Sequence, residues 1–328
     1  MIIAVTGANG HVGANLCQKL VEKGDYVRAL SHQNDYALKH LKTTIFQGDL
    51  LDPNFLESFV DGVDVVFHLA AKISIAGDPL GTVRRLNVEG TRNIIQASQK
   101  AGVKKFIHFS SIHAFRQEPL NQILDETREL VDDNAFSYDR SKADGERIVM
   151  EAANNGLNAF ILSPTAIIGP MDYEPSLMGK AFLQLVNRQI PALVPGGYNW
   201  VDVRDIVSAA IDSINKGRNG EKYLLSGKWH SLKEIAILIE KTTQKRTTQM
   251  EMPFWVAKAG LPFITFHSRI TGAVPLYTKE SLEIIKKSNK LISNSKARKE
   301  LGFTPRPIEE TITDIFNWFN KNDFLNKK

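Results

Sequence analysis

The sequence has almost no cysteine, with a single one, at position 17, among 328 residues. One cysteine excludes an internal disulfide framework and any metal site built from several thiolates. Cys17 lies in the apolar-periodic stretch HVGANLCQKL, which favours a small buried residue over a nucleophile. We therefore expect no disulfide and no resident metal.

Long apolar runs are also missing. The most apolar stretch of the C-terminal third, PFWVAKAGLPFITF, is interrupted by Lys258 and Pro262 and is too short to span a bilayer. It favours a helix that lines a pocket, with contact to a membrane surface as the lesser alternative. The first apolar residues lead directly into a glycine-rich turn, without a basic leader or a cleavage site. These features predict a cytoplasmic protein with no membrane span.

Neither sign of charge is in large excess. Lysine and arginine number 41 against 36 acidic residues, and the basic residues are spread along the chain apart from KARKE and the terminal NKK. This distribution indicates a solvated surface and no nucleic-acid partner. The hydrophobic fraction of 43% is typical of a globular enzyme, and the length allows one large α/β domain with a lobe or two domains.

The first half of the chain alternates short β-branched runs with stretches of helical apolar spacing. The strand runs are continuously apolar, which indicates a parallel sheet covered by helices on both faces. We therefore predict an α/β fold with a doubly wound parallel sheet of the Rossmann type. The expected strands are MIIAVTG, YVRAL, TTIFQGD, DVVFHLA, KKFIHFSS and NAFILSP, with helices between them.

The alternation ends after Gly169, where proline and glycine punctuate GPMDYEPSLMGK and PALVPGGYNW. Helices are expected at DIVSAAIDSI, SLKEIAILIEKTT and IEETITDIFNWFNK. These segments predict a smaller, mainly helical C-terminal substrate lobe interleaved with the sheet. We assign residues 1–170 and 198–228 to the sheet domain, and residues 171–197 and 229–328 to the lobe.

The stretch VTGANGHVG places Gly7, Gly10 and Gly13 between the first strand and the first helix. Glycine permits a tight turn, a close backbone approach to phosphate and close packing of helix on strand, and the helix N-terminus attracts a pyrophosphate. In this context the triplet predicts a dinucleotide site, with a glycine-rich loop that binds nothing as the alternative. The other candidate contacts in the turn are Asn9, His11 and Val12, and His11 is expected to face solvent at the helix start.

An acidic residue that would hold the adenosine ribose of NAD is missing after the second strand. VRALSHQND ends its strand at Ser31 and His32, with Arg28 nearby, and Asp35 comes too late. Without that carboxylate nothing repels a 2′-phosphate, so NADP is favoured over NAD. His32 and Lys39 are candidate phosphate contacts, and an ordinary surface role is the alternative for both.

The segment AFSYDRSKADGERI places Tyr138 and Lys142 four residues apart. On a helix this spacing puts both side chains on one face, where they can reach the same bound molecule. Basic residues are so common in the chain that nearly one such pair is expected by chance, so the spacing alone decides nothing.

With the glycine turn in place, the chain resembles the extended short-chain dehydrogenase/reductase family. TGANGHVG, GDLLDP, VFHLAA, NVEGTRN, FSS, YDRSK, LSPTAIIGP and VDVRDIV occur in the family's order and cover at least residues 1–210. ALSHQND, GERI, GEKYLLSG and KARKELGFTPRPIEETI are most similar to the dihydroflavonol-4-reductase-like branch and its bacterial relatives named as sugar epimerases.

The resemblance implies roles for the central residues. Tyr138 would be the general acid for carbonyl reduction, with its pKa lowered toward 7 by the Lys142 ammonium. Lys142 would also hold the nicotinamide ribose, and Ser111 would hydrogen-bond the substrate oxygen. The further cofactor contacts implied are Asp49 and Leu50 at the adenine, Leu69, Ala70 and Ala71 near the pyrophosphate and ribose, Asn87, and Pro164 at the nicotinamide. The apolar residues among these contacts could instead belong to the hydrophobic core. Asn87 could instead take part in helix packing.

Departures from the family pattern narrow the reaction. SSIHAF carries no carboxylate where nucleotide-sugar dehydratases have an acidic pair, which argues against dehydration. Tyr198 stands where epimerases often have an arginine that binds the diphosphate, and a phenol offers no cationic fork. Tyr198 and Trp200 suit a flatter or more apolar substrate, Arg204 could still bind an anion, and His113 is a further candidate contact.

These features predict an oxidoreductase that prefers NADP, accepts NAD, and acts on a small-molecule carbonyl compound or the corresponding secondary alcohol. An NAD-dependent sugar epimerase is the alternative enzyme, and a cofactor-sensing protein on the same fold is the alternative outside catalysis. The retained Ser111, Tyr138 and Lys142 set weighs against a sensor. The substrate and the oligomeric state stay open, with a homodimer as a common arrangement of this fold.

Overall fold

Seven parallel strands form the central sheet of the computed structural model, which describes residues 1–32, 34–271 and 277–325, with the backbone alone for 263–271. The strand order is β3-β2-β1-β4-β5-β6-β9, so the direction of winding reverses between β1 and β4. In open α/β sheets ligands bind at such a reversal, beyond the carboxyl ends of the strands. The strands are β1 (Ile2–Thr6), β2 (Tyr26–Ser31), β3 (Thr44–Gln47), β4 (Val65–His68), β5 (Lys105–Phe109), β6 (Ala159–Pro164) and β9 (Lys222–Leu225).

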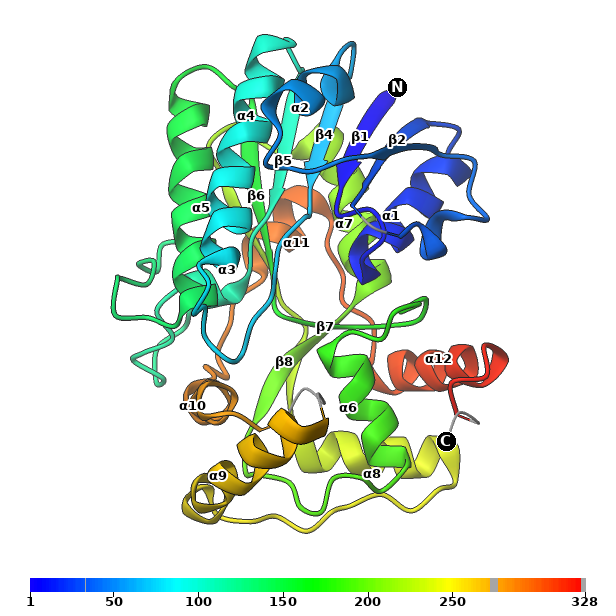
Figure 1. Ribbon diagram of the computed structural model, residues 1–328, viewed down its shortest axis with the longest axis vertical. Helices are drawn as coiled ribbons and strands as arrows, with labels where there is room; N and C mark the ends of the chain where they lie inside the picture. The colour runs from blue at the N-terminus through cyan, green and yellow to red at the C-terminus, as the bar shows by residue number, and fades with distance from the viewer. Residues whose placement is uncertain (33, 272–276, 326–328) are drawn as a thin grey trace.

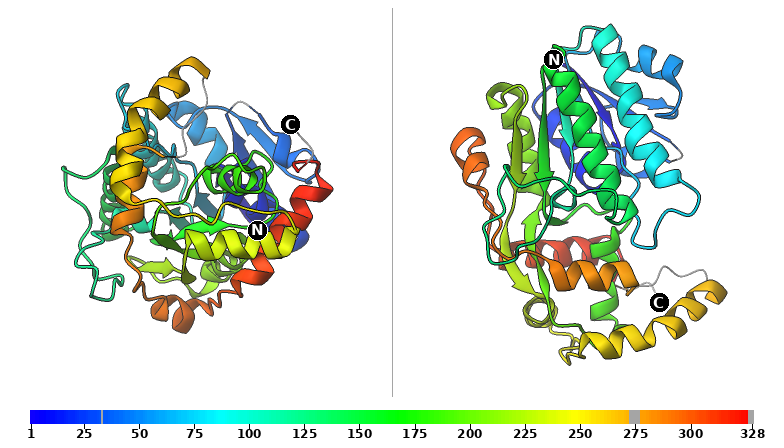
Figure 2. Two further views of the ribbon diagram at one scale, coloured as in Figure 1. Left: turned by 90° about the horizontal axis from the view of Figure 1, so that it is seen from below. Right: turned by 90° about the vertical axis from the view of Figure 1, so that its left-hand side faces the viewer.

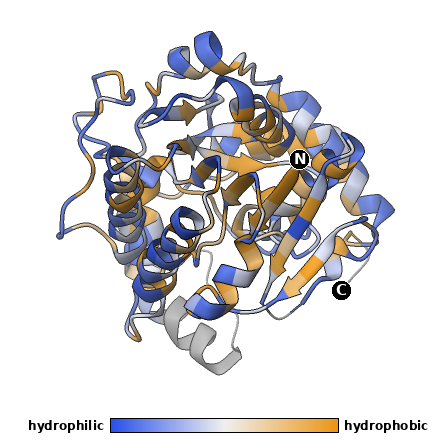
Figure 3. Ribbon diagram, turned by 90° about the horizontal axis from the view of Figure 1, so that it is seen from above, coloured by the Kyte–Doolittle hydropathy of each residue, from blue (hydrophilic) through white to orange (hydrophobic). Residues whose placement is uncertain are grey.

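Helices cover both faces of this sheet (Figures 1 and 2). Two separate apolar clusters lie between the sheet and the helices, one on each face, as parallel strands buried on both sides require. Figure 3 shows this layering as apolar strands between helices whose outer surfaces are hydrophilic. One face carries α2 (Pro53–Val60), α4 (Gly90–Lys100) and α5 (Ser137–Asn154), and the other carries α1 (His11–Glu22), α7 (Val203–Lys216) and α11 (Ser295–Leu301).

Local signals in the sequence explain where several of these elements begin. Asp52 caps α2 by accepting hydrogen bonds from the backbone N–H groups of Asn54 and Phe55, and Pro53 occupies the first turn. The predicted long helix over VRRLNVEGTRNIIQASQKAG is divided into α3 (Thr82–Arg84), a π-helical segment (Arg85–Glu89) and α4. The six predicted strands and the helices between them are confirmed.

The remaining elements form a lobe below the carboxyl ends of the strands (Figure 1). Its main apolar cluster gathers side chains from three helices, α6, α8 and α12, around a three-stranded sheet in the order β10-β8-β7. The strands are β7 (Ala166–Ile168), β8 (Gly197–Asp202) and β10 (Lys228–Ser231), and the helices are α6 (Leu177–Val186), α8 (Leu232–Thr243), α9 (Phe254–Thr271), α10 (Lys279–Lys287) and α12 (Ile308–Lys321).

The lobe is mainly helical, as expected, and also contains a small sheet. Two features differ from the expected division of the chain. β8 belongs to the small sheet, although residues 198–228 were assigned to the domain of the large one. α11 packs on the large sheet through Ala297 and Leu301, although residues 229–328 were assigned to the lobe. Both differences arise from pairings between segments far apart in the sequence, which local periodicity does not encode.

The apolar stretch that includes Pro262 forms α9, as expected for a helix. However, α9 contributes no described side chain to either of the protein's two main cavities, whereas α10 lines one of them. Within the described part of the chain, no helix combines the length and the apolarity that crossing a bilayer requires.

Candidate active site

The glycine turn after β1 forms a tight cradle at the start of α1. Gly7 has a φ of +68°, and a Cβ there would lie 2.7 Å from the backbone nitrogen of Ala70. A Cβ on Gly13 would lie 2.1 Å from the carbonyl oxygen of Gly7, and one on Gly10 would lie 3.3 Å from the same atom. Side chains at Gly7 and Gly13 are therefore excluded by backbone contacts, as the dinucleotide hypothesis requires.

The first turn of α1 is free to receive an anion. Its N-cap, Gly10, offers no side-chain hydrogen bond, and no acidic residue occurs in the first turn. Backbone N–H groups at a helix N-terminus, together with the helix dipole, attract phosphate. The cradle opens into a cavity of about 510 Å³, large enough for a substantial part of a dinucleotide. The residues present therefore fit a dinucleotide cofactor.

About half of the predicted cofactor contacts line this 510 Å³ cavity. They are Gly7, Asn9, Gly10, Ser31, His32, Asp49, Leu50 and Ala70. The remaining candidates are absent from the described lining of this cavity: His11, Val12, Gly13, Leu69, Ala71, Asn87, Tyr138, Lys142 and Pro164. Lys72 and Arg85 also line it and were not anticipated, since nothing in their local sequence distinguishes them from surface cations.

The end of β2 shapes the part of the cavity where the adenosine ribose is expected. Ser31 is buried, and its hydroxyl donates to the carbonyl oxygen of Asn34. The amide of Asn9 donates to the Asn34 side chain at 2.5 Å, which fixes the loop after β2. Lys39, a candidate phosphate contact, is exposed and 3.9 Å from Asp35, outside the described lining.

His11 ties the glycine turn to the lobe. It was expected to face solvent, but it is half-buried, and its Nε2 lies 3.0 Å from the carbonyl oxygen of Pro170. Asn15 donates to the same carbonyl oxygen at 3.3 Å. The His11 side chain therefore helps to fix the segment that follows β7, and Val12 packs against the apolar cluster beneath the sheet.

Asn87 also has a structural position. Its side chain accepts a hydrogen bond from the backbone N–H of Lys72 at 2.7 Å and donates to the carbonyl oxygen of the same residue at 3.0 Å. It also donates to the hydroxyl of Ser141 at 2.9 Å. Asn87 therefore fixes the segment after β4 to α5, which fits the helix-packing alternative.

The fold brings Ser111, Tyr138 and Lys142 together at the carboxyl end of β5. Ser111 follows β5 and is hydrogen-bonded to Tyr138, which lies in the first turn of α5. The Lys142 ammonium, one turn further along α5, is buried and donates to the carbonyl oxygen of Phe109 at 2.7 Å. The predicted pair thus shares one helix face and meets the end of the neighbouring strand.

The electrostatics of this group differ from the expectation that Lys142 lowers the tyrosine pKa. Burial raises the pKa of Tyr138, which the Ser111 hydrogen bond partly offsets and the Asp139 charge reinforces. Burial also lowers the pKa of Lys142 to about 8. In this geometry the phenol is protonated at neutral pH, which is the form that a proton donor requires.

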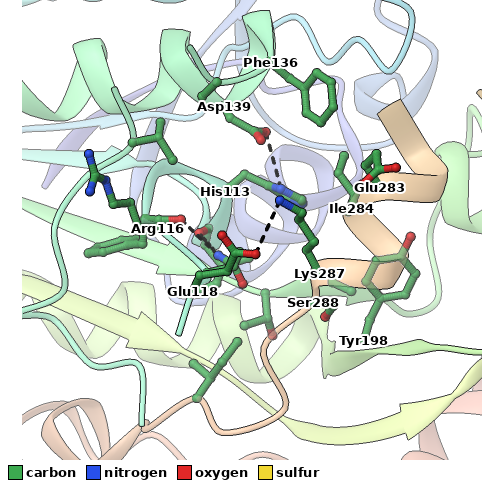
Figure 4. A pocket seen from close by; sticks show the side chains of 18 of the residues that line it. His113, Arg116, Glu118, Phe136, Asp139, Tyr198, Glu283, Ile284, Lys287 and Ser288 are labelled. Carbon is green, nitrogen blue, oxygen red and sulfur yellow. Dashed lines mark hydrogen bonds and ion pairs between the residues drawn. The ribbon is translucent and has the colours of Figure 1, made fainter. Parts of the chain in front are cut away.

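A second cavity, of about 630 Å³, lies between the sheet domain and the lobe (Figure 4). His113, Asp139 and Tyr198 line it, so two predicted candidates reach this cavity. Asp139 is a residue that the sequence analysis missed, although it directly follows Tyr138. Much of the remaining wall is apolar, with Ile112, Phe115, Val131, Phe136, Met178, Ile284 and Ile292.

Trp200 and Arg204 are absent from the described lining of this 630 Å³ cavity. Trp200 is buried beside Tyr198 and Phe182, and its indole donates to the carbonyl oxygen of His230 at 3.0 Å. The Arg204 guanidinium is bound to Asp202 at 2.7 Å and to Asp314 at 2.6 Å. The expectation that these two residues contact substrate is therefore not supported by the structure.

The charged side chains in the wall of the 630 Å³ cavity affect which ligands the cavity can bind. Arg116 and Lys287 are its two lysine or arginine residues, whereas four carboxylates line it. Arg116 is 2.8 Å from Asp132, and Lys287 is 3.4 Å from Glu118. A wall with more carboxylates than cations disfavours a dianionic ligand.

Comparison with known proteins gives a family match over most of the chain. Residues 3–226 match the family described as the NAD dependent epimerase/dehydratase family. A sterol demethylase protein B from Methylococcus capsulatus is 31% identical, covering 99% of this chain and 100% of the relative. A candidate dihydroflavonol 4-reductase from Synechocystis sp. is 30% identical, covering 98% and 95%.

The fold is shared with solved structures of lower identity. The UDP-glucose 4-epimerase of Thermotoga maritima, solved with UDP-glucose, superposes with a TM-score of 0.81 at 22% identity, over 98% of this chain and 99% of that one. This likeness concerns the fold alone.

Proposed function

Because the chain belongs to the NAD dependent epimerase/dehydratase family, we propose that it is an oxidoreductase. Its substrate would be a neutral, largely apolar ketone, which it reduces with NADPH, or the corresponding alcohol, which it oxidises. It is an NAD(P)-dependent enzyme of the extended short-chain dehydrogenase/reductase type, as its family and its full-length relatives indicate. The observation that carries the proposal is that Ser111 and Tyr138 are close together and that their chain neighbours Ile112 and Asp139 line a cavity with apolar and acidic walls.

The proposed mechanism assigns one task to each polar group. The nicotinamide, when bound, supplies the hydride that reduces the carbonyl carbon. Ser111 fixes the carbonyl oxygen beside Tyr138, and the phenol donates its proton to that oxygen as negative charge develops there. Lys142 is buried one turn beyond Tyr138 on α5 and would hold the nicotinamide ribose, so its amine would contribute both to binding and to proton transfer.

The substrate class follows from the walls of the 630 Å³ cavity. Its apolar side chains favour a hydrophobic body, and its excess of carboxylates disfavours a nucleotide diphosphate. Epimerases often bind the diphosphate through an arginine at the position that Tyr198 occupies here. Arg204 is a poor substitute for it, because its guanidinium is already paired with two carboxylates. The Methylococcus capsulatus relative is named a sterol demethylase protein, which supports an alicyclic ketone or alcohol of sterol size.

The preference for NADPH is supported by the end of β2. Ser31 stands where a carboxylate would bind the ribose of NAD, and Lys72, Arg85 and His32 line the same cavity. Cations near a 2′-phosphate favour NADP, and the absence of an acid at Ser31 removes the usual repulsion.

The first experiment compares the two reactions that the family name allows. The protein is incubated with dihydrotestosterone and NADPH while absorbance is followed, and in parallel with UDP-glucose or UDP-galactose while epimers are followed by NMR. We expect net oxidation of NADPH with the ketosteroid and no interconversion of the sugars, because a single hydride transfer consumes cofactor. Rapid epimerisation without net cofactor turnover would replace the reductase proposal with an epimerase.

A further inference from the structure

The side chains of His113 and Asp139 face each other in the wall of the 630 Å³ cavity (Figure 4). The segment SSIHAF has no carboxylate after Ser111, which argued against proton abstraction from carbon. The fold supplies that carboxylate from another element. Asp139, in the first turn of α5, brings its Oδ1 to 3.4 Å from Nδ1 of His113, in the 3-10 turn Ile112–Ala114.

The pair lies directly beside the proposed proton donor. The His113 and Tyr138 rings meet edge to face, with centroids 6.1 Å apart. The side chain of His113 is 28% exposed, and its Nε2 makes no hydrogen bond to any residue in the described ranges. The carboxylate behind Nδ1 can hold the imidazole in the tautomer whose Nε2 accepts a proton. This arrangement leaves one basic nitrogen in the cavity, next to the group that binds the carbonyl oxygen.

The surroundings of Asp139 also suit proton transfer. Its Oδ1 is buried and, apart from the 3.4 Å approach to Nδ1 of His113, has no hydrogen-bond partner within the described part of the chain, and burial raises its pKa. Glu280 of α10 is close enough for its pKa to be raised by the charge of Asp139, and its buried Oε1 likewise has no described hydrogen-bond partner. Buried polar atoms without partners are rare in folded proteins and are a feature of catalytic sites.

We propose that His113, oriented by Asp139, removes and returns a proton on the carbon next to the substrate carbonyl. This activity rests on the proposed function, because the ketone is the one that Ser111 and Tyr138 bind. The C–H bond breaks, its proton goes to Nε2 of His113, and its electron pair forms the C=C bond of an enolate. The oxygen of the enolate receives its charge while hydrogen-bonded to Tyr138 and Ser111. Return of a proton from His113 restores the ketone, so no oxidant or reductant is consumed.

The substrate class narrows accordingly. The ketone must carry a hydrogen on a carbon next to the carbonyl, and that carbon must face His113 while the oxygen faces Tyr138. With hydride transfer at the carbonyl carbon, the site would then combine redox chemistry with proton exchange or double-bond migration at the neighbouring carbon.

The test measures hydrogen exchange directly. Dihydrotestosterone is incubated in D₂O with the protein and NADP⁺, and deuterium incorporation next to the ketone is followed by mass spectrometry. We expect wild-type protein to catalyse incorporation, and His113→Gln to slow it by about two orders of magnitude, as for loss of a general base. Asp139→Asn should also slow incorporation, because the amide no longer fixes the tautomer. Asp144→Asn is the matched control, since Asp144 pairs with Arg147 on the outer part of the same helix and should leave exchange unchanged.

NADPH oxidation with the same ketone is measured for every variant, which reports on folding and on hydride transfer. His113→Gln should retain this activity within about tenfold, so that the ratio of exchange to reduction falls. Reduction by wild-type protein without deuterium incorporation would overturn this inference and leave the proposed function in place. Deuterium incorporation without NADPH oxidation would overturn the proposed reductase function and leave the proton exchange by His113 in place. A parallel fall of both rates in His113→Gln would also overturn it, since His113 would then only support Tyr138.

Discussion

At the scale of single residues, the proposed chemistry depends on the hydroxyl group of Tyr138. Its neighbours act on it in opposite directions, because the Ser111 hydrogen bond lowers the pKa of the phenol and the charge of Asp139 raises it. Burial outweighs the hydrogen bond, so the phenol remains protonated at neutral pH. The phenol is therefore in the protonated form, as the proposed proton donor for carbonyl reduction must be.

Replacing Tyr138 by phenylalanine tests this role. Tyr138→Phe should lower turnover of the ketone by about two to four orders of magnitude, because it removes the proton donor but no packing volume. Affinity for NADPH, measured by fluorescence titration, should stay nearly intact. Tyr26→Phe is the control, since that exposed hydroxyl contacts only Thr44 among the described residues. A Tyr138→Phe protein with half of the wild-type activity would contradict the assignment.

Lys142 should behave differently from Tyr138, because its amine has two tasks in the proposed mechanism. Lys142→Met is expected to reduce both turnover and NADPH affinity. The buried ammonium donates to the carbonyl oxygen of Phe109 at 2.7 Å, so the fold of the variant needs to be checked by circular dichroism. Loss of turnover with unchanged NADPH affinity would mean that Lys142 does not hold the ribose.

At the scale of elements, the carboxyl end of β2 is expected to decide the choice of cofactor. The strand lies between β3 and β1 and is buried at its carboxyl end, where its last residue, Ser31, lines the cavity of about 510 Å³ together with Asn34 and His32. Because the loop after β2 is fixed by Asn9 and Asn34, a longer side chain at position 31 has little room except toward the cavity. A substitution at position 31 should therefore change the preference between NADH, with its free ribose hydroxyl, and NADPH, with its ribose phosphate.

Ser31→Asp should shift the preference toward NADH, since a carboxylate accepts hydrogen bonds from the ribose hydroxyls and repels a 2′-phosphate. The ratio of dissociation constants for NADPH and NADH, measured by titrating intrinsic fluorescence, gives the effect directly. Ser31→Asn is the matched control, because it has nearly the same size without the charge. Tighter binding of NADH than NADPH by the wild-type protein would refute the NADPH preference.

At the scale of the whole molecule, α10 connects the lobe to the sheet domain next to the proposed site. Thr278, its N-cap, donates to the carbonyl oxygen of Ile75, and Glu280 accepts from the backbone N–H of Gly77 at 3.3 Å. The same helix lines the cavity through Ile284 and Lys287. A change in the charge of Glu280 therefore acts on the contact between the two parts of the protein.

The pH dependence of stability tests this contact. Burial raises the pKa of Glu280 from 4.5 to about 7, so its contribution is fully present below pH 4.5 and is lost as the pH rises through 7. Glu280→Gln should remove this loss, making the variant more stable relative to wild type at pH 8 than at pH 5, by about 1–3 kcal/mol. Urea unfolding at a series of pH values measures the difference.

Glu283, one turn further along α10, provides the opposite control. Its hydrogen bond with Lys258 lowers its pKa, so its contribution is present above the ordinary pKa and is lost on acidification. Glu283→Gln should therefore destabilise the protein slightly at neutral pH and not at low pH. If both glutamine variants showed the same pH dependence, Glu280 would not be a buried, pKa-raised carboxyl group.

Much of the fold and part of the site could be predicted from the sequence, because the determining signals are local. The alternation of apolar strands and amphipathic helices follows from side-chain periodicity, and the glycine turn follows from backbone space at Gly7 and Gly13. Tyr138 and Lys142 share a face because they lie four residues apart on one helix. Of these features, only the space at Gly7 involves a distant segment, the backbone at Ala70.

The rest was decided by tertiary packing, which joins segments that the sequence keeps apart. β8 pairs with β7 and β10 and is not part of the large sheet. Arg204 forms an ion pair with Asp314, which lies 110 residues away in the sequence. The carboxylate next to His113 belongs to Asp139, on another element. Glu280 accepts a hydrogen bond from Gly77, which lies 203 residues away in the sequence. Local periodicity determines which side chains face a core, but only the packed structure determines which charges meet, because charge pairing depends on distance in space.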